Sequence, residues 1–168
     1  TIDNKLATGF THYKDAWWCY GMKANPQGYC VYSNRLYKNG TAVTGTALTE
    51  YTTGDGETYL FKGANYNTGY TDFNGYKYFG RTRYTGTYIG NGIDYYYVKG
   101  VLEVGDKIDH SGKLYTNGVH YTDTGLDYLH SNGKYYDNGV LEVGDNIEHA
   151  GKLYTNGVHD TSTGLDYL

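Results

Sequence analysis

The stretch VLEVGDKIDHSGKLYTNGVHYTDTGLDYL at residues 101–129 decides the fold, because it recurs as VLEVGDNIEHAGKLYTNGVHDTSTGLDYL at residues 140–168. The two copies are 29 residues long, lie 39 positions apart and differ at five positions. Repeats of such length are typical of arrays in which each copy folds as one small element and packs on its neighbours. The chain is therefore expected to be a repeat protein.

Each copy is in turn made of two shorter units. The segments GKLYTNGVHYTDTG at 112–125 and GKYYDNGVLEVG at 133–144 share one template: Gly, a Tyr-bearing strand, Asn-Gly, a second strand and a closing Gly. The template can be followed back to residue 34, although the sequence diverges from it increasingly toward the N-terminus. From Gly86 onward its closing glycines stand 19 or 20 residues apart. The closing glycines are Gly9, Gly45, Gly69, Gly86, Gly105, Gly125, Gly144 and Gly164.

The Asn-Gly pairs predict tight hairpins. Where Asn-Gly stands between two short alternating strands, as in KLYT-NG-VHYT, it favours a type I′ turn, since both turn residues need a positive φ. A lone hairpin is only marginally stable in water, so each must pack on the next. No window shows a helical stripe of adequate length. The predicted fold class is all-β, a solenoid of stacked β-hairpin repeats of about 20 residues with little or no helix.

Tyrosine must supply most of the core, because the chain has 23 Tyr against 4 Phe and 1 Met. Tyrosines that recur at one place in the template can be stacked core residues or a ladder of platforms for sugar rings. The core interpretation is favoured, since little else can fill the hairpins. This column is Tyr37, Tyr59, Tyr78, Tyr96, Tyr115, Tyr136 and Tyr154.

The interval between Gly9 and Gly45 breaks the period and holds both tryptophans, both cysteines and the one proline. We predict residues 1–33 to be a partial repeat plus an aromatic and Cys-containing insertion that forms a cap or tip, and residues 34–168 to be the hairpin array. Insertions in repeat proteins often carry the binding face, whereas a cap would shield the first hydrophobic layer. Both interpretations of Trp17 and Trp18 stay open.

Cys19 and Cys30 stand eleven residues apart. Such a pair can close a hairpin as a disulfide, with two free thiols as the rival interpretation. A metal site would need further ligands, and only His12 lies close in sequence. A disulfide would indicate an oxidising, extracellular setting.

The segment TGLDYLHSNGKYYDNGVLEVG at 124–144 resembles the cell-wall-binding repeats of choline-binding and glucan-binding surface proteins. The resemblance covers roughly residues 34–168 and implies hairpin units wound into an extended β-solenoid. That family usually has an aromatic residue just after the closing Gly, where it helps to cage choline or packs on a sugar. Here only Phe10 and Tyr70 are aromatic at those positions, so a choline cage is poorly supported. A looser similarity exists to repeats of bacteriophage and bacterial surface fibres.

Composition and motifs exclude several classes of function. Fourteen Lys and Arg against 18 Asp and Glu, with no basic run, argue against nucleic acid. No apolar stretch approaches the roughly 20 residues of a membrane helix, so membrane insertion is not expected. No catalytic or phosphate-binding motif occurs, so an enzyme and a cofactor are not expected. The recurring histidines are interpreted as copied turn residues, and no metal site is predicted.

These observations predict a non-enzymatic surface-binding module that recognises a cell-envelope polysaccharide or other surface glycan through repeated weak sites. The alternative is a structural component of an extracellular fibre, phage tail fibre or surface appendage, in which the repeats act as a spacer and the chain self-associates. Either would be extracellular, on a cell surface or on a virion surface. The candidate ligand-binding residues are Trp17, Trp18, Tyr20, Tyr29, Tyr121, Tyr128 and Tyr167.

Overall fold

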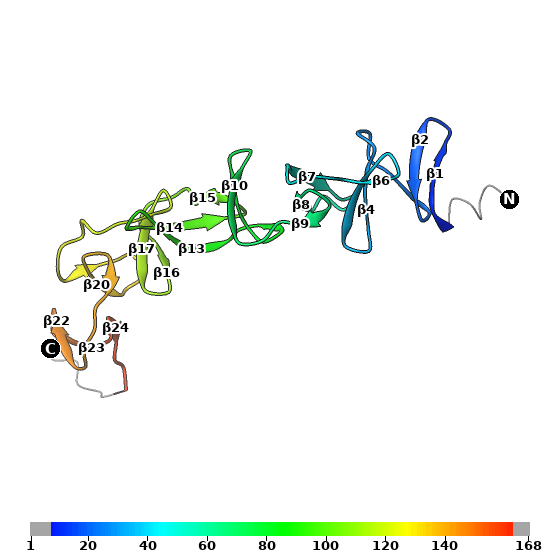
Figure 1. Cartoon of the computed structure of the whole chain (residues 1–168). Helices are drawn as coiled ribbons and strands as arrows, with labels where there is room; N and C mark the ends of the chain where they lie inside the picture. Colours follow the sequence, from blue (N-terminus) through cyan, green and yellow to red (C-terminus); the bar gives the residue numbers. More distant parts are fainter. Residues whose placement is uncertain (1–7, 163–168) are drawn as a thin grey trace. The chain divides into compact units, whose positions relative to one another are not determined.

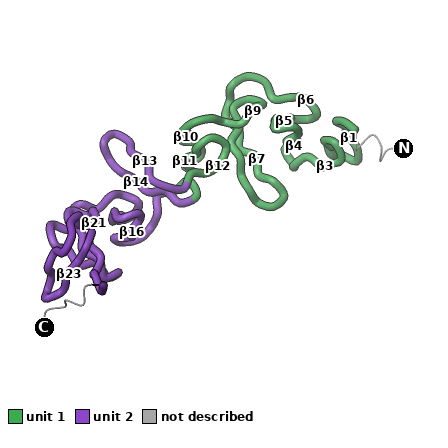
Figure 2. Tube along the Cα trace, turned by 90° about the horizontal axis from the view of Figure 1, so that it is seen from below, with its two compact units in different colours: residues 1–84, 99–101 green, residues 85–98, 102–168 purple. Residues whose placement is uncertain are grey.

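The structure, a computed structural model, describes residues 8–162 and is built from β-strands (Figure 1). Within these residues Thr8 is the one helical residue, so the predicted all-β class is confirmed. No helix in this range is long and apolar enough to cross a membrane. Contacts divide the chain into two compact units, residues 1–84 with 99–101 and residues 85–98 with 102–168 (Figure 2).

The strands of residues 8–162 follow one another in eight groups of three, which we call β-repeats. In each group two strands joined by a turn are followed by a third strand of two residues. The third strand pairs antiparallel with the second, as Thr41–Ala42 does with Arg35–Lys38. The template of the sequence is thus a hairpin plus a short closing strand.

The first compact unit contains four β-repeats among its described residues. They form two three-stranded sheets, β1-β2-β3 and β4-β5-β6, and one six-stranded sheet in the order β10-β11-β12-β8-β7 with β9 on β8. Their bounds are β1 Phe10–Tyr13, β2 Ala16–Cys19, β3 Met22–Lys23, β4 Tyr29–Tyr32, β5 Arg35–Lys38, β6 Thr41–Ala42, β7 Leu48–Thr52, β8 Thr58–Lys62, β9 Asn65–Tyr66, β10 Tyr70–Phe73, β11 Tyr76–Phe79 and β12 Thr82–Arg83.

The later strands form a larger sheet in the order β13-β14-β18-β17-β21-β20-β19, with β16 on β17, and a three-stranded sheet β22-β23-β24. Their bounds are β13 Gly86–Gly90, β14 Ile93–Val98, β15 Val101–Leu102, β16 Ile108–His110, β17 Lys113–Thr116, β18 Val119–His120, β19 Tyr128–Leu129, β20 Tyr135–Asp137, β21 Val140–Leu141, β22 Ile147–His149, β23 Lys152–Thr155 and β24 Val158–His159.

The Asn-Gly pairs make the turns that the sequence predicts. In Asn117-Gly118, for example, φ is +49° and +72°, and Thr116 pairs with Val119 across the turn. Asn132 is the exception, because its φ is not positive and its side-chain oxygen instead accepts the N–H of Lys134 at 3.0 Å. Glycine and asparagine tolerate this left-handed region better than other residues, which explains the recurrence of the pair.

From β5 onward, a backbone hydrogen bond from the second strand joins each β-repeat to the next. The N–H of a central residue in the second strand donates to the turn region of the following β-repeat, as Leu36 does to Ala64 and Leu114 to Gly139, both at 2.8 Å. The carbonyl of the same residue accepts the N–H seven positions later, as in Leu114 and Tyr121. Consecutive hairpins are therefore linked pairwise, whereas the superhelical winding of a solenoid stays a prediction.

The second strands also carry the core. Tyr78, Tyr136 and Leu114 are fully buried. The predicted tyrosine column is confirmed as core at Tyr78, Tyr115, Tyr136 and Tyr154, which are buried, and its remaining members are half-buried. Since no β-repeat contributes more than three buried apolar side chains, stability depends on packing between neighbours.

Buried tyrosine hydroxyls donate to carboxylates of an earlier β-repeat. Tyr78 donates to Glu50, Tyr115 to Asp94 at 3.1 Å, and Tyr136 to Asp109 at 2.8 Å. Burial and the adjacent carboxylate raise the pKa of Tyr78 and of Tyr136 to about 12. These bonds explain why a core this thin uses tyrosine rather than phenylalanine, because the ring is buried while its hydroxyl keeps a partner.

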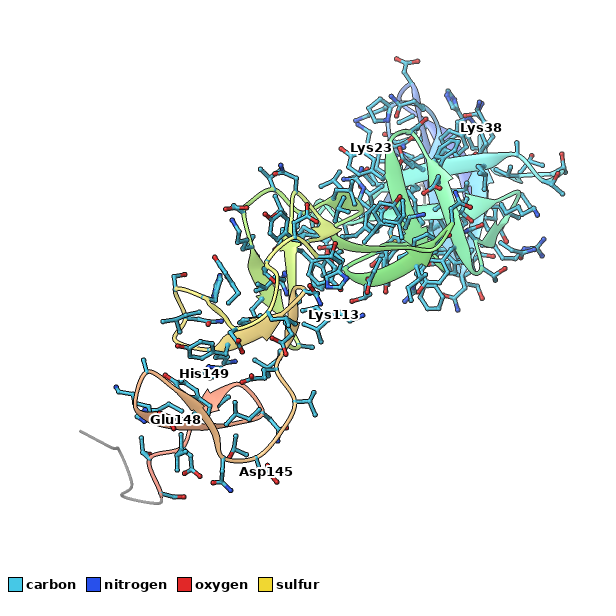
Figure 3. All side chains as sticks on the ribbon, turned by 90° about the vertical axis from the view of Figure 1, so that its left-hand side faces the viewer. Lys23, Lys38, Lys113, Asp145, Glu148 and His149 are labelled. Carbon is cyan, nitrogen blue, oxygen red and sulfur yellow. A yellow bond between two sulfur atoms is a disulfide. The ribbon has the colours of Figure 1, made fainter. Side chains whose placement is uncertain are left out.

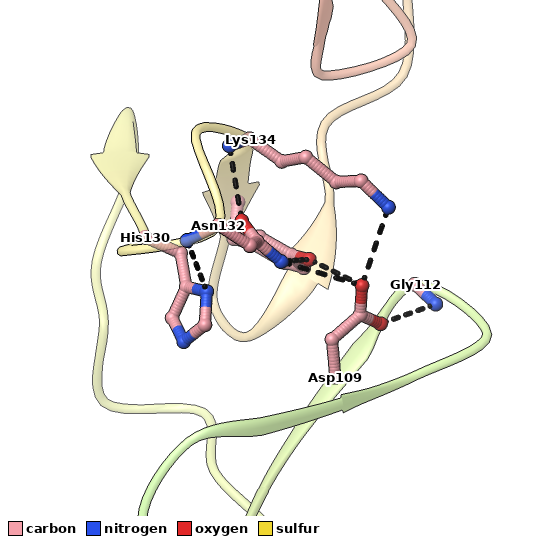
Figure 4. A network of polar contacts seen from close by, with 6 residues as sticks. Asp109, Gly112, His130, Asn132 and Lys134 are labelled. Atoms are coloured by element: carbon pink, nitrogen blue, oxygen red, sulfur yellow. Dashed lines mark hydrogen bonds and ion pairs between the residues drawn. The ribbon is translucent and has the colours of Figure 1, made fainter.

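Asp109 is the centre of such a network (Figure 4). Its carboxylate accepts the Gly112 N–H and the Tyr136 hydroxyl at 2.8 Å each, and Lys134 Nζ lies 3.4 Å away. Burial alone would raise the pKa of Asp109, but the two hydrogen bonds and the lysine charge outweigh it, so the pKa lies below its ordinary value.

The segment predicted as an insertion folds as a further β-repeat, β1 to β3. Its Trp17 carbonyl accepts the N–H of Ala24 at 2.8 Å, the same seven-residue bond that Leu36 makes with Val43. The interval between Gly9 and Gly45 therefore holds two β-repeats, and the period looked broken because Asn25-Pro-Gln-Gly28 replaces the closing Thr-Gly. The first compact unit ends its main segment at residue 84. The predicted division at residue 33 and the cap or tip role stay predictions.

A disulfide joins these first two β-repeats. Cys19 of β2 and Cys30 of β4 are bonded, with their Cα atoms 6.6 Å apart, and both are buried. Phe10, Trp17 and Tyr37 pack against the bond. The cross-link fixes the position of β2 against β4 and hence of Trp17 within the candidate site.

Candidate functional site

A concave site with a volume of about 730 Å³ lies in the first two β-repeats. It is formed around Trp17 by the first hairpin, the loop that follows it and the β5–β6 turn. Its lining residues are His12, Lys14, Asp15, Ala16, Trp17, Lys23, Ala24, Asn25, Pro26, Gln27, Gly28 and Asn39.

Trp17 is held in place on two sides. His12 is its cross-strand partner on β1, and the two rings meet edge to face with centroids 5.4 Å apart. On another side the ring packs on Gly40, where a Cβ atom would lie 2.5 Å from a ring carbon. Only glycine permits this approach, and the same residue needs a φ of +79° for its turn. The half-buried indole is thus a rigid wall of the site.

The loop at residues 25–28 forms another wall. Asn25 Oδ1 accepts the N–H groups of Gln27 at 3.1 Å and Tyr29 at 2.8 Å. The Gly28 carbonyl in turn accepts the N–H of Asn39 at 2.9 Å, which ties the loop to the β5–β6 turn. The loop is therefore ordered by its own hydrogen bonds, while the exposed side chain of Gln27 faces solvent.

The site combines one aromatic wall with many hydrogen-bonding side chains. Carboxylate, amide, imidazole and ammonium groups are all present around Trp17. The lining includes two lysines, Lys14 and Lys23, and one carboxylate, Asp15, so it carries an excess of positive charge (Figure 3 labels Lys23). An aromatic face that contacts C–H groups, surrounded by polar groups for hydroxyls, is chemistry suited to a neutral or acidic sugar.

A second aromatic surface lies on β10 and β11. Tyr70 and Phe79 pair across the two strands with ring centroids 4.7 Å apart, and about half of each side chain is exposed, 47% and 53%. The Tyr84 ring meets Tyr70 edge to face at 5.1 Å. This exposed cluster is also of a kind that sugar rings can contact.

Of the predicted ligand-binding residues, only Trp17 lines the large concave site within the described residues. Trp18 follows it on the strand and so points to the opposite face; its indole nitrogen is buried without a hydrogen-bond partner in the described part of the chain. Tyr20 is 37% exposed and stacks on Tyr32 with centroids 3.7 Å apart. Tyr29 is half-buried beneath the Lys38 ammonium, 5.0 Å from the ring centre.

Two of the predicted residues in the last repeats, Tyr121 and Tyr128, both lie near Lys107. Tyr121 is half-buried under Lys107, whose Nζ lies 5.0 Å from the ring centre. Tyr128 is also half-buried, with its ring 6.4 Å from that of His130. Tyr167 lies outside the described residues. Whether these tyrosines bind a ligand stays a prediction.

Tyr70 and Phe79 are absent from the candidates that the sequence indicated. Tyr70 could have been found, because it is one of two aromatic residues that directly follow a closing glycine. Phe79 had no such signal, since its exposure depends on which face of β11 packs inward. Tyr78 is buried and Phe79 exposed because adjacent strand residues point to opposite faces.

Comparisons with known proteins add little to this geometry. No family model and no curated protein matches the chain. Among solved structures it is similar to CbpJ from Streptococcus pneumoniae TIGR4, at 19% identity and a TM-score of 0.32, over 90% of this chain and 57% of that one. The chain thus spans a little over half of that protein. A TM-score this low supports no inference about function, so any functional proposal depends on the residues of this chain.

Proposed function

We propose that the protein is a non-enzymatic extracellular module that binds a cell-envelope polysaccharide or other surface glycan. Binding is summed over several weak sites along a solenoid of β-hairpin repeats. The observation that carries the proposal is the concave site at Trp17, where a rigid indole is surrounded by polar side chains. The disulfide between Cys19 and Cys30 supports an oxidising, extracellular setting.

The lining residues favour a neutral or acidic glycan over a cationic one. Lys14 and Lys23 outnumber Asp15, so a quaternary ammonium group would be repelled at Trp17. The exposed pair Tyr70 and Phe79 offers a further platform elsewhere in the same compact unit. Each contact is weak by itself, and a polymer that engages both would bind more tightly than a short oligosaccharide.

The test is binding of the full chain to isolated cell walls and to a glycan array, with Trp17→Ala alongside. We expect Trp17→Ala to weaken binding by about tenfold or more, in line with loss of a stacked aromatic anchor. The control is Ile89→Ala, which removes an apolar side chain that is 68% exposed and distant in sequence from the site. Equal binding by wild type and Trp17→Ala, with both folded, would exclude this site.

The alternative function is a structural component of an extracellular fibre or appendage. Val104 and Val143 occupy equivalent positions in the two long copies and are 87% and 83% exposed, which favours a repeated apolar contact between chains. Sedimentation of the purified chain separates the two proposals. Filaments that form without glycan binding, and that are lost in Val104→Ser with Val143→Ser, would favour the fibre.

A further inference from the structure

One histidine in the second compact unit lies between two carboxylates. His149 Nε2 is 2.9 Å and 3.1 Å from the two carboxylate oxygens of Glu142, and His149 Nδ1 is 3.9 Å from Asp127. One ligand atom from each residue can be chosen so that all three lie within 4.8 Å of one another. Figure 3 labels His149, which is the last residue of β22.

The burial of this cluster is uneven. The Glu142 side chain is only 6% exposed and that of His149 10%, whereas the Asp127 side chain is 67% exposed. A carboxylate this deeply buried must be neutralised, and no lysine or arginine forms an ion pair with Glu142 within the described residues. A cation bound beside the imidazole would supply the compensating positive charge.

Two tyrosines fix the orientation of the imidazole. The Tyr135 ring stacks on His149 with centroids 3.8 Å apart and planes 12° apart, and the Tyr154 ring meets it edge to face at 5.5 Å. The ring therefore cannot turn freely, and Nε2 stays directed at Glu142. A fixed histidine beside a buried carboxylate is the kind of preorganised ligand pair that metal sites require.

We propose that Asp127, Glu142 and His149 form a binding site for a divalent transition-metal ion of the zinc type. The imidazole and Glu142 provide the fixed pair of ligands, and Asp127 closes the site from the solvent side. A mixed set of nitrogen and carboxylate donors suits zinc, whereas calcium and magnesium prefer oxygen alone. Water would complete the coordination shell.

The geometry requires one side chain, that of Asp127, to move. Ligand atoms about 2.1 Å from a tetrahedral ion lie about 3.4 Å apart. The Glu142 and His149 atoms are already near this separation, at 2.9 Å. Asp127 lies on the Nδ1 side of the ring, 3.9 Å from that nitrogen, so its exposed side chain must rotate toward the Nε2 side to join the other two ligands.

The chain holds an internal control for this site. In the earlier copy His110 Nε2 lies 2.6 Å from Glu103, and His110 stacks on Tyr96 at 3.5 Å. These residues repeat Glu142, His149 and Tyr135 at the offset of 39 positions. The residue 39 positions before Asp127 is, however, Tyr88. Among the described residues, only the later pair, Glu142 and His149, therefore has a third ligand nearby.

The experiment is titration of the metal-stripped full chain with Zn²⁺, followed by calorimetry, with Ca²⁺ in a parallel run. Wild type is expected to bind one Zn²⁺, and the bound ion should raise the thermal unfolding midpoint because it binds the folded state. Asp127→Asn should weaken Zn²⁺ binding by at least about tenfold. Its matched control is Asp145→Asn, an exposed acid shortly before β22 that lies away from His149 in Figure 3 and should leave binding unchanged.

A second pair of variants tests the histidine. His149→Gln should abolish Zn²⁺ binding, while His110→Gln should leave it intact. Asp127→Asn keeps the proposal testable if His149→Gln fails to fold, since circular dichroism will report that failure. The proposal is overturned if wild type takes up no Zn²⁺, if Asp127→Asn binds as tightly as wild type, if His110→Gln weakens binding as much as His149→Gln, or if Ca²⁺ binds more tightly than Zn²⁺.

Discussion

At the scale of single residues, the protein is held together by tyrosines whose rings are buried and whose hydroxyls bind carboxylates. Tyr115 and Tyr136 follow this pattern with Asp94 and Asp109. Tyr154 occupies the place of Tyr115 in the later copy, but the residue 39 positions after Asp94 is Gly133. The later copy therefore lacks the carboxylate that Tyr115 uses, although the rest of the core is repeated.

Tyr136→Phe tests this contact. The variant removes the hydroxyl that Asp109 accepts at 2.8 Å and leaves a partly buried carboxylate short of one donor. We expect a loss of about 1–3 kcal/mol in the free energy of unfolding, measured with a chemical denaturant. Tyr154→Phe is the matched control and should cost less than about 0.5 kcal/mol. Equal losses in both variants would contradict the role of the carboxylate.

At the scale of elements, the short third strand and the turn glycines bring successive β-repeats into contact. Gly118 follows Asn117 in a type I′ turn, and its carbonyl accepts the Tyr96 N–H at 2.8 Å. A Cβ atom on Gly118 would lie 2.8 Å from the Tyr96 carbonyl oxygen. Gly92 follows Asn91 in an equivalent turn, but a Cβ atom there would meet nothing within 4 Å. Glycine is thus required by backbone conformation at both turns and by close packing at one.

Gly118→Ala and Gly92→Ala separate these two requirements. Gly92→Ala should cost about 1–2 kcal/mol, the effect of a positive φ alone. Gly118→Ala should cost about 1–3 kcal/mol more, because it also pushes two β-repeats apart. Thermal and denaturant unfolding will measure both. If the two variants lose the same stability, the contact between β-repeats contributes little.

At the scale of the whole molecule, the buried tyrosines predict sensitivity to alkali. The pKa of Tyr78 and of Tyr136 is about 12 in the folded protein, against an ordinary value of 10.0. A group whose pKa is raised on folding contributes stability that is complete below the unfolded pKa and is lost as pH rises through the folded pKa. Stability should therefore fall between pH 10 and pH 12.

Denaturant unfolding at a series of pH values checks this expectation. The double variant Tyr78→Phe with Tyr136→Phe should be less stable at neutral pH, but it should lose less stability than wild type over the alkaline range. An alkaline loss of the same size in both proteins would show that other groups cause it. The absorbance of tyrosinate, followed in parallel, will report whether these tyrosines of the folded chain ionise at a higher pH than ordinary tyrosines do.

The sequence by itself determined the repeat, the all-β class and the turns, because Asn-Gly and alternating strands act over a few residues. It also indicated the tyrosine core and gave Trp17 as a candidate ligand-binding residue. Only the tertiary structure decided that residues 10–23 form a β-repeat, since the missing Thr-Gly concealed the period while the backbone hydrogen bonds did not. The exposure of Phe79 and the meeting of Asp127 with Glu142 and His149 likewise depend on contacts between β-repeats, and such long-range packing has no local pattern from which it can be predicted.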